Sequence, residues 1–249
     1  MPRYFLEVAY KGTNYSGFQV QQNANSIQRE VEKAFSIIQK EKIGLTGSSR
    51  TDAGVHALQN FFHFDFDGTI DSHLVYKMNA ILPADIAISK VIPVGSTAHC
   101  RFDATSREYK YFIYRRKDPF LKERAFYFPY KLNAGFMQQA ADLIKNYDDF
   151  TSFSKRKTQV KSFICNIDES KWDWEGDCLV YYVRANRFLR GMVRALVATM
   201  LQIGREKMTV DEFKRLIEEK NCTKASFAAP SHGLFLISVN FPEGYFSTR

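Results

Sequence analysis

The amino-acid sequence predicts an α+β fold with mainly antiparallel strands, and three observations predict it. The chain has 249 residues, 45% of them apolar, which is enough for one or two domains with a sizeable core. Over residues 1–100 the apolar pattern follows the order strand, helix, strand, strand, helix, strand. Further on, two long strand patterns at 161–172 and 178–187 are joined by a glycine turn, as in an antiparallel pair.

The first hundred residues read as one ferredoxin-like unit, because that order of elements is typical of it. The expected strands are 4–11, 43–46, 62–66 and one beginning at 86, and the helices follow Asn25 and Asp71. Asn25 and Gln28 are spaced as a capping box, and Pro83 ends the second helix. We place the domain boundary near Cys100, which gives domains 1–100 and 101–249.

The second half is larger and less regular. The elements expected there are a strand at 105–116, a helix capped by Asn133, the two long strands, a helix at about 188–202, a short helix with a capping box at Thr209 and Glu212, and a strand at 233–239. No repeat or low-complexity tract interrupts them.

Charge is distributed unevenly along the chain. The net charge is +8; residues 1–100 hold 9 basic and 9 acidic side chains, whereas residues 101–249 hold 26 and 18. Basic clusters at 115–117 and 155–157 add to this asymmetry and favour a polyanionic partner such as nucleic acid, although solubility alone could account for the charge.

Composition also limits the compartment and the class of site. No apolar run has the length of a membrane span, and the N-terminus enters a strand pattern without a secretory signal. The four cysteines are scattered with no C-x-x-C pair, so neither a zinc site nor a disulfide framework is expected. These observations favour a cytoplasmic protein.

The loop at 48–57 carries the main candidate for chemistry. Asp52 is followed by Ala53 and Gly54, which leave room for a bulky group to approach the carboxylate. Arg50 precedes it by two residues, and a neighbouring guanidinium favours the ionised carboxylate that a nucleophile needs. The alternative is a polar β-turn in which Asp52 caps a turn and Arg50 is solvated.

Sequence motifs along nearly the whole chain resemble those of the TruA family of tRNA pseudouridine synthases. The matching segments are 10–21, 50–56 (Arg-Thr-Asp-Ala-Gly-Val-His), 79–83, 107–111, 149–153 and 186–194, in the order usual for that family. The sequence departs from the family pattern at Lys11, Phe18 and Cys100, none of which is the proposed nucleophile.

The resemblance implies a fold and an activity. It implies two similar ferredoxin-like (RRM-like) α/β domains with a basic cleft between them. It also implies cofactor-free conversion of uridine to pseudouridine in the anticodon arm of tRNA, at positions 38 to 40, by a homodimer. Asp52 matches the catalytic aspartate of the family, and Arg50 is a suitable residue to fill the space that a flipped uridine leaves. No metal or nucleotide cofactor is expected.

Tyr109 is the first candidate for a contact with the base. It lies between Arg107 and Lys110 in a strand, and an aromatic ring beside cations suits a nucleobase next to phosphates. A core tyrosine is the commoner outcome. By resemblance Tyr109 matches the tyrosine that packs against the target uridine, and Tyr111, on the same face of the strand, is the second choice.

Two arginines spaced one helical turn apart, Arg190 and Arg194, are candidates for the partner of Asp52. On a helical wheel Arg190 looks the more buried of the two, but the family pattern assigns the ion pair to Arg194. We follow the family for the pair and assign Arg190 to the RNA backbone. The alternative is that both side chains extend to solvent.

Two other classes of protein remain as alternatives. A non-catalytic RNA-binding protein would explain the charge and the aromatic residues without using Asp52. A hydrolase would use Ser49, Asp52 and His56, but the G-x-S-x-G turn is absent and residues this close in one loop seldom form a triad. His56 is expected to be structural. The zinc deaminase motif is absent as well.

Overall fold

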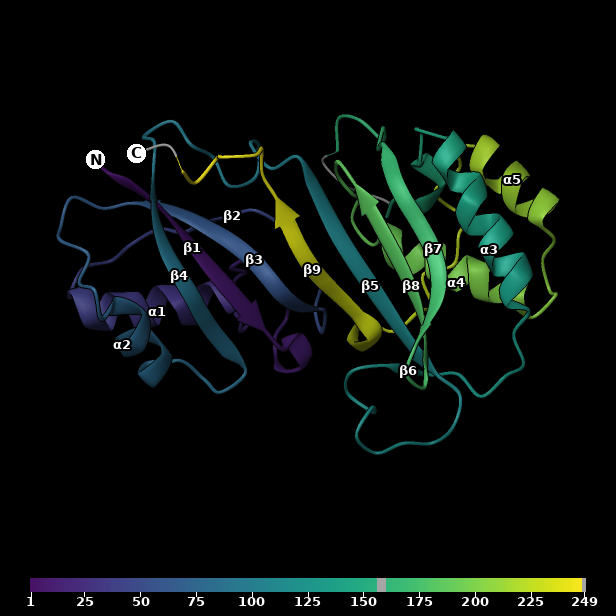
Figure 1. Ribbon diagram of the computed structural model, residues 1–249, viewed down its shortest axis with the longest axis horizontal. Helices are drawn as coiled ribbons and strands as arrows, with labels where there is room; N and C mark the ends of the chain where they lie inside the picture. Colours follow the sequence, from purple (N-terminus) through teal and green to yellow (C-terminus); the bar gives the residue numbers. More distant parts are fainter. Residues whose placement is uncertain (156–159, 248–249) are drawn as a thin grey trace. The chain divides into compact units, whose positions relative to one another are not determined.

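The computed structural model describes residues 1–155 and 160–247, so the basic cluster at 155–157 lies partly outside the described residues. The strands are β1 (Arg3–Tyr10), β2 (Thr46–Gly47), β3 (His56–Asp65), β4 (Ile86–Val94), β5 (Ser106–Tyr114), β6 (Phe126–Tyr127), β7 (Ile167–Glu175), β8 (Cys178–Ala185) and β9 (Leu234–Asn240). The helices are α1 (Ile27–Gln39), α2 (Leu74–Ile81), α3 (Ala134–Leu143), α4 (Met192–Gly204) and α5 (Val210–Glu218), with four short 3-10 turns. The α+β class and the mostly antiparallel sheet are therefore confirmed (Figure 1).

Contacts divide the chain into two compact units. The first holds residues 1–105 and 236–249, and the second holds residues 106–235. The end of the chain therefore lies with the first unit, because most of β9 runs beside β3. No helix within the described residues is both long and apolar enough to cross a lipid bilayer.

In the first unit the strand order is β4, β1, β3, with β2 pairing the far side of β3 and all these pairs antiparallel. Both helices lie on one face of this sheet, and α1 contacts α2 (Figure 1). The face under the helices carries Phe62 and Phe64, and Phe64 meets Phe35 of α1 edge-on at 5.0 Å. Ser26, rather than Asn25, caps α1, because its side chain accepts the backbone N–H of Arg29.

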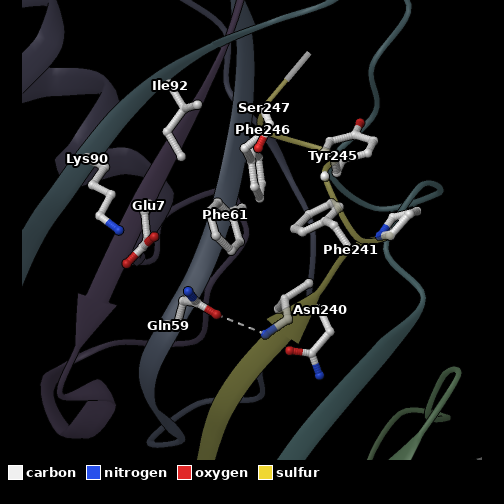
Figure 2. A pocket seen from close by; sticks show the side chains of 13 residues that line it. Glu7, Gln59, Phe61, Lys90, Ile92, Asn240, Phe241, Tyr245, Phe246 and Ser247 are labelled. Atoms are coloured by element: carbon white, nitrogen blue, oxygen red, sulfur yellow. Dashed lines mark hydrogen bonds between the residues drawn. The ribbon is translucent and has the colours of Figure 1, made fainter.

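Part of the other face of the same sheet is buried as well, which the alternating pattern did not predict. Phe61 lies on that face, and the C-terminal segment 241–247 packs over it, with Phe241 edge-on to Phe61 at 5.3 Å. Figure 2 shows this segment beside a hollow of about 430 Å³, whose floor includes Glu7 and Lys90. Gln59 accepts the backbone N–H of Val239 there.

His63 is buried on this second face of β3. Its Nδ1 lies 3.2 Å from the Cys100 sulfur, and its ring meets that of His99 at 4.5 Å. Burial, with smaller contributions from the neighbouring His99 and Arg3, lowers the pKa of His63 to about 4, and the carboxylates of Asp65 and Asp103 only partly oppose this.

The second unit has an antiparallel sheet in the order β5, β8, β7, with the short β6 pairing β5 in parallel. Helices α3, α4 and α5 pack together, and α3 contacts β7 (Figure 1). Nearly every residue of α4 is buried, so this helix is the centre of the unit's core. The predicted caps are confirmed: Asn133 caps α3, and Thr209 with Glu212 forms a capping box on α5.

Two boundaries in the second unit differ from the prediction. The strand predicted to begin at Lys161 begins at Ile167, although Ile164 makes an isolated bridge to Asp149. The helix predicted from about Phe188 begins at Met192, because Gly191 adopts a left-handed conformation with φ of 74°. Apolar spacing extends through both boundaries, which is why it did not reveal them.

We expect Gly47→Ala to destabilise the first unit. A Cβ at this position would lie 2.3 Å from the Phe18 ring, which is buried and stacked on Phe62 at 4.5 Å and so has little room to move. Overpacking of this kind costs about 1–3 kcal/mol. Urea unfolding measures it. Gly44→Ala, where no atom lies within 4 Å of the added Cβ, is the matched control. Equal losses in the free energy of unfolding for the two substitutions would contradict the packing argument. Adding Phe18→Leu to Gly47→Ala should restore part of the lost stability, because the smaller side chain makes room for the Cβ.

We also expect the stability of the protein to fall between pH 7 and pH 5 because of His63. Its folded pKa of about 4 lies below the ordinary value, so the unfolded chain binds more protons in this interval and the free energy of unfolding decreases as the pH falls. At about 1.4 kcal/mol per pKa unit, the loss is about 2 kcal/mol. Urea unfolding at both pH values should show a smaller pH difference for His63→Gln. His73→Gln, at an exposed histidine, is the control. If the free energy of unfolding of His63→Gln still falls between pH 7 and pH 5 as much as that of the unaltered protein, His63 is not the cause.

Candidate active site

The loop that carries Asp52 connects β2 to β3 and is held by the backbone of the segment after β1. The Phe18 N–H donates to the Thr51 carbonyl at 3.2 Å, and the Gly54 N–H donates to the Tyr15 carbonyl at 3.3 Å. The Val55 N–H closes a turn on the Asp52 carbonyl at 3.2 Å. Gly54 has a φ of 77°, so a residue with a side chain would be strained there. The loop is therefore a tight, supported turn.

A buried polar clamp holds the same loop from the side of β3. The amide of Asn60 accepts the Ser49 N–H at 3.3 Å and donates to the Ser49 carbonyl at 2.9 Å. The same amide nitrogen donates to the Tyr10 hydroxyl at 3.2 Å, and that hydroxyl lies 2.7 Å from the Thr51 hydroxyl. The residues on both sides of Arg50 are thus fixed by hydrogen bonds in the protein interior. The one sign of this clamp in the sequence is an asparagine within an aromatic strand.

Burial changes sharply along these few residues. Ser49 and Thr51 are buried, Asp52 is half-buried, and Arg50 is exposed. Because the neighbours on either side are anchored, the guanidinium and the carboxylate project from a rigid backbone. This is the preorganisation that a catalytic carboxylate needs.

His56 is structural, as expected from the sequence. It is buried, and its Nδ1 accepts the backbone N–H of Gly12 at 3.0 Å. Gly12 itself is required there, because a Cβ would lie 2.0 Å from the Val55 carbonyl oxygen. Among the described residues, the buried Ser49 hydroxyl has no hydrogen-bond partner, so it lacks the contact to a base that a hydrolase nucleophile uses. This arrangement does not support the hydrolase alternative.

In the second unit, Tyr109 and Tyr111 of β5 differ in exposure. Tyr109 is half-buried and meets the Phe188 ring edge-on at 5.1 Å. Tyr111 is fully buried, and its hydroxyl donates to the Pro230 carbonyl at 2.8 Å. Burial also raises the pKa of the Tyr111 phenol. The expectation that Tyr111 contacts substrate is therefore not supported by this arrangement, whereas Tyr109 has an accessible ring.

The two candidate arginines also differ from the helical-wheel expectation. Arg190 is exposed and precedes α4, since the helix begins only after Gly191. Arg194 is half-buried, and its Nε donates to the Ala229 carbonyl at 2.7 Å. The wheel therefore ranked the two residues in the wrong order, because it extended the helix past its true start. Arg194 is the guanidinium with a fixed orientation.

Comparison with known proteins identifies a family. A family model described as tRNA pseudouridine synthase matches residues 7–103 and 147–242. The chain is 44% identical to tRNA pseudouridine synthase A of Parabacteroides distasonis, over 99% of this chain and 98% of that protein. It is 43% identical to the protein of the same name from Bacteroides thetaiotaomicron, over 99% of this chain and 93% of that protein. It is 37% identical to the protein of the same name from Staphylococcus aureus, over 97% of this chain and 92% of that protein.

We expect Asn60→Ala to destabilise the protein and loosen the loop. The substitution leaves both backbone groups of Ser49 without their buried partner, whereas the Tyr10 hydroxyl keeps its contact with Thr51. Each unsatisfied buried group costs about 1–3 kcal/mol. The free energy of unfolding should fall by more than about 2 kcal/mol, and amide hydrogen exchange at Ser49 and Thr51 should accelerate. Leu58→Ala, at a 58% exposed position of the same strand, is the control. Equal losses in the two variants would argue against the clamp.

Proposed function

The chain belongs to the TruA family of tRNA pseudouridine synthases, which are isomerases, and from this we propose that Asp52 is the catalytic group for converting uridine to pseudouridine at positions 38 to 40 of tRNA. The observation that carries the proposal is the rigid turn around Asp52. Hydrogen bonds on both sides fix its backbone, while its side chain and that of Arg50 are accessible. Ala53 and Gly54 add no bulk beside the carboxylate.

The reaction breaks the N-glycosidic bond from the ribose to uracil N1 and forms a C-glycosidic bond to C5. The proton on C5 leaves and N1 gains a proton, so no oxidant, metal or nucleotide cofactor is needed for the balance. Asp52 can act by attack on the sugar, by attack on the base, or by removal of a proton. All three routes need an ionised carboxylate, which a neighbouring guanidinium favours.

The other proposed residues act on the same uridine. Arg194 is the proposed ion-pair partner of Asp52, and its Nε contact to the Ala229 carbonyl gives it a defined orientation. Tyr109 is proposed to stack on the uracil, and its edge-on contact with Phe188 supports the ring. Arg50 would fill the space that the flipped nucleotide leaves, and the exposed Arg190 would contact the RNA backbone.

The wider organisation implied by the family remains part of the proposal. It comprises two ferredoxin-like domains, 1–100 with the catalytic loop and 101–249 with most of the positive charge, and a homodimer that acts on tRNA in the cytoplasm. In the first unit the strand order β4, β1, β3, with the two-residue β2 also pairing β3 beside β9, supports this assignment.

A non-catalytic RNA-binding protein is the remaining rival, and one assay separates it from an isomerase. Unmodified tRNA transcript carrying tritium at uracil C5 releases tritium when the C-glycoside forms. An isomerase releases it without cleaving the chain. A binding protein retards the tRNA on a gel and releases nothing.

We expect Asp52→Asn to lower the rate of tritium release by at least about a thousandfold, since removal of a nucleophile commonly costs this much or more. Affinity for tRNA should be nearly unchanged, because the amide keeps the size of the carboxylate. Asp67→Asn, at an exposed carboxylate of the same unit, is the control and should behave as the unaltered protein. Loss of tRNA binding in parallel with activity would count against a purely chemical role for Asp52.

A further inference from the structure

A hollow of about 260 Å³ lies beside the catalytic loop, entirely within the first unit. Its lining includes Arg50, Arg101, Phe102 and the side chains of Gln19 and Gln28, and no carboxylate among the described residues lines it. This volume is below the range of about 300–1,000 Å³ found for sites that enclose a drug-sized molecule. The hollow therefore suits one small group with negative charge, such as the phosphate of a nucleotide whose base lies outside it on the exposed Phe102 ring.

Phe102 is an unusual component of this hollow, because its ring is 73% exposed. The ring packs on the His99 imidazole at a centroid distance of 4.2 Å, and the Arg101 guanidinium lies 5.6 Å from the Phe102 centroid. A flat apolar ring that is exposed, supported from one side and accompanied by a cation has the features of a stacking platform for nucleobases.

The loop that carries Phe102 is built in advance of any ligand. His99 Nδ1 accepts two backbone N–H groups, from Arg101 at 3.2 Å and from Phe102 at 3.3 Å. The Asp103 carboxylate accepts the His99 N–H at 2.8 Å and the Tyr245 hydroxyl at 2.6 Å. These bonds fix the loop at both ends, so little conformational entropy is lost when a base stacks on the ring.

The distance along the chain to Asp52 defines which nucleotide this hollow can serve. Arg50 lines the hollow and precedes Asp52 by two residues, so their Cα atoms are at most about 7 Å apart. Stacked nucleotides of one strand are separated by about 3.4 Å along the helix axis. Because Arg50 and Phe102 line the same hollow, a base that stacks on Phe102 lies within a few nucleotides of a uridine at Asp52.

We propose that this hollow binds the tRNA nucleotide next to the isomerised uridine, with its base stacked on Phe102 and its phosphate bound by Arg101. The proposal rests on the function proposed above and adds a binding site to it. Because every base has a π face, such a platform accepts any neighbouring base, and it holds the strand in place while the uridine leaves the stack.

Binding of unmodified tRNA transcript to the full chain tests the proposal. Phe102→Leu should weaken binding by about 5- to 100-fold, the loss that removal of one base–aromatic stack produces, and Phe102→Trp should restore it. Tyr76→Leu, at a 75% exposed aromatic position on α2, is the matched control and should bind as the unaltered protein does. Arg101→Gln should reduce the salt dependence of binding by about one unit of slope, whereas Phe102→Leu should leave the slope unchanged.

Transcripts with an abasic site on the 5′ or the 3′ side of the target uridine identify the contact directly. If the missing base is the one that stacks on Phe102, Phe102→Leu causes no further loss on that transcript, as a double-mutant cycle requires. The proposal is overturned if Phe102→Leu lowers the affinity for both abasic transcripts as much as it lowers the affinity for intact tRNA. It is also overturned if Phe102→Leu binds intact tRNA normally. If the unaltered protein releases tritium and Phe102→Leu binds tRNA normally, this site alone is overturned. Failure of the unaltered protein to release tritium overturns the proposed function instead. If this surface binds a protein partner instead of tRNA, Phe102→Leu leaves tRNA binding unaffected, and the proposal is overturned.

Discussion

The buried amide of Asn60 is the contact on which the organisation of the Asp52 loop depends. It lies inside β3 and reaches back to both backbone groups of Ser49 and to the Tyr10 hydroxyl, which in turn meets Thr51. A loop of this polar composition would otherwise have many conformations. Here two strands and one side chain hold it in a single conformation, and the half-buried carboxylate of Asp52 is presented from a rigid support.

The loop with Phe102 is constructed on the same principle. One half-buried acceptor, His99 Nδ1, binds two successive backbone N–H groups and so orients the side chains of Arg101 and Phe102 outward. The imidazole must be unprotonated at Nδ1 to accept them, and burial lowers the pKa of His99 in the direction that favours this. In both loops, therefore, side-chain hydrogen bonds to the backbone hold the chain while other side chains reach the surface. Recognition of a flexible RNA benefits from such rigid contact points, because only the RNA then loses conformational freedom.

The sheet of the first unit shows why both loops can be so well supported. β3 has aromatic side chains on both faces: α1 covers Phe62 and Phe64, and the C-terminal segment with Phe241 covers Phe61. The same C-terminal segment contributes Tyr245, whose hydroxyl holds Asp103 of the Phe102 loop. The last residues of the chain thus stabilise a loop that lies more than 140 positions earlier in the sequence.

The sequence by itself determined the α+β class, most of the elements, two of the helix caps and the family, because these depend on local patterns and on motifs that lie within a few residues. It also marked Asp52 and Arg50 as candidates for the chemistry, and that assignment stays a prediction. Other features were decided by the tertiary structure alone. The wheel placed Arg190 in a helix that Gly191 prevents from starting there. Strand alternation could not distinguish half-buried Tyr109 from fully buried Tyr111, which Gly233 and Pro230 enclose. Likewise, the sequence near Phe61 does not indicate that Phe241 covers its ring. The sequence near Phe102 does not indicate that Tyr245 holds Asp103 of its loop. Burial and hydrogen-bond partners are set by segments far apart in the chain, and local periodicity carries no information about them.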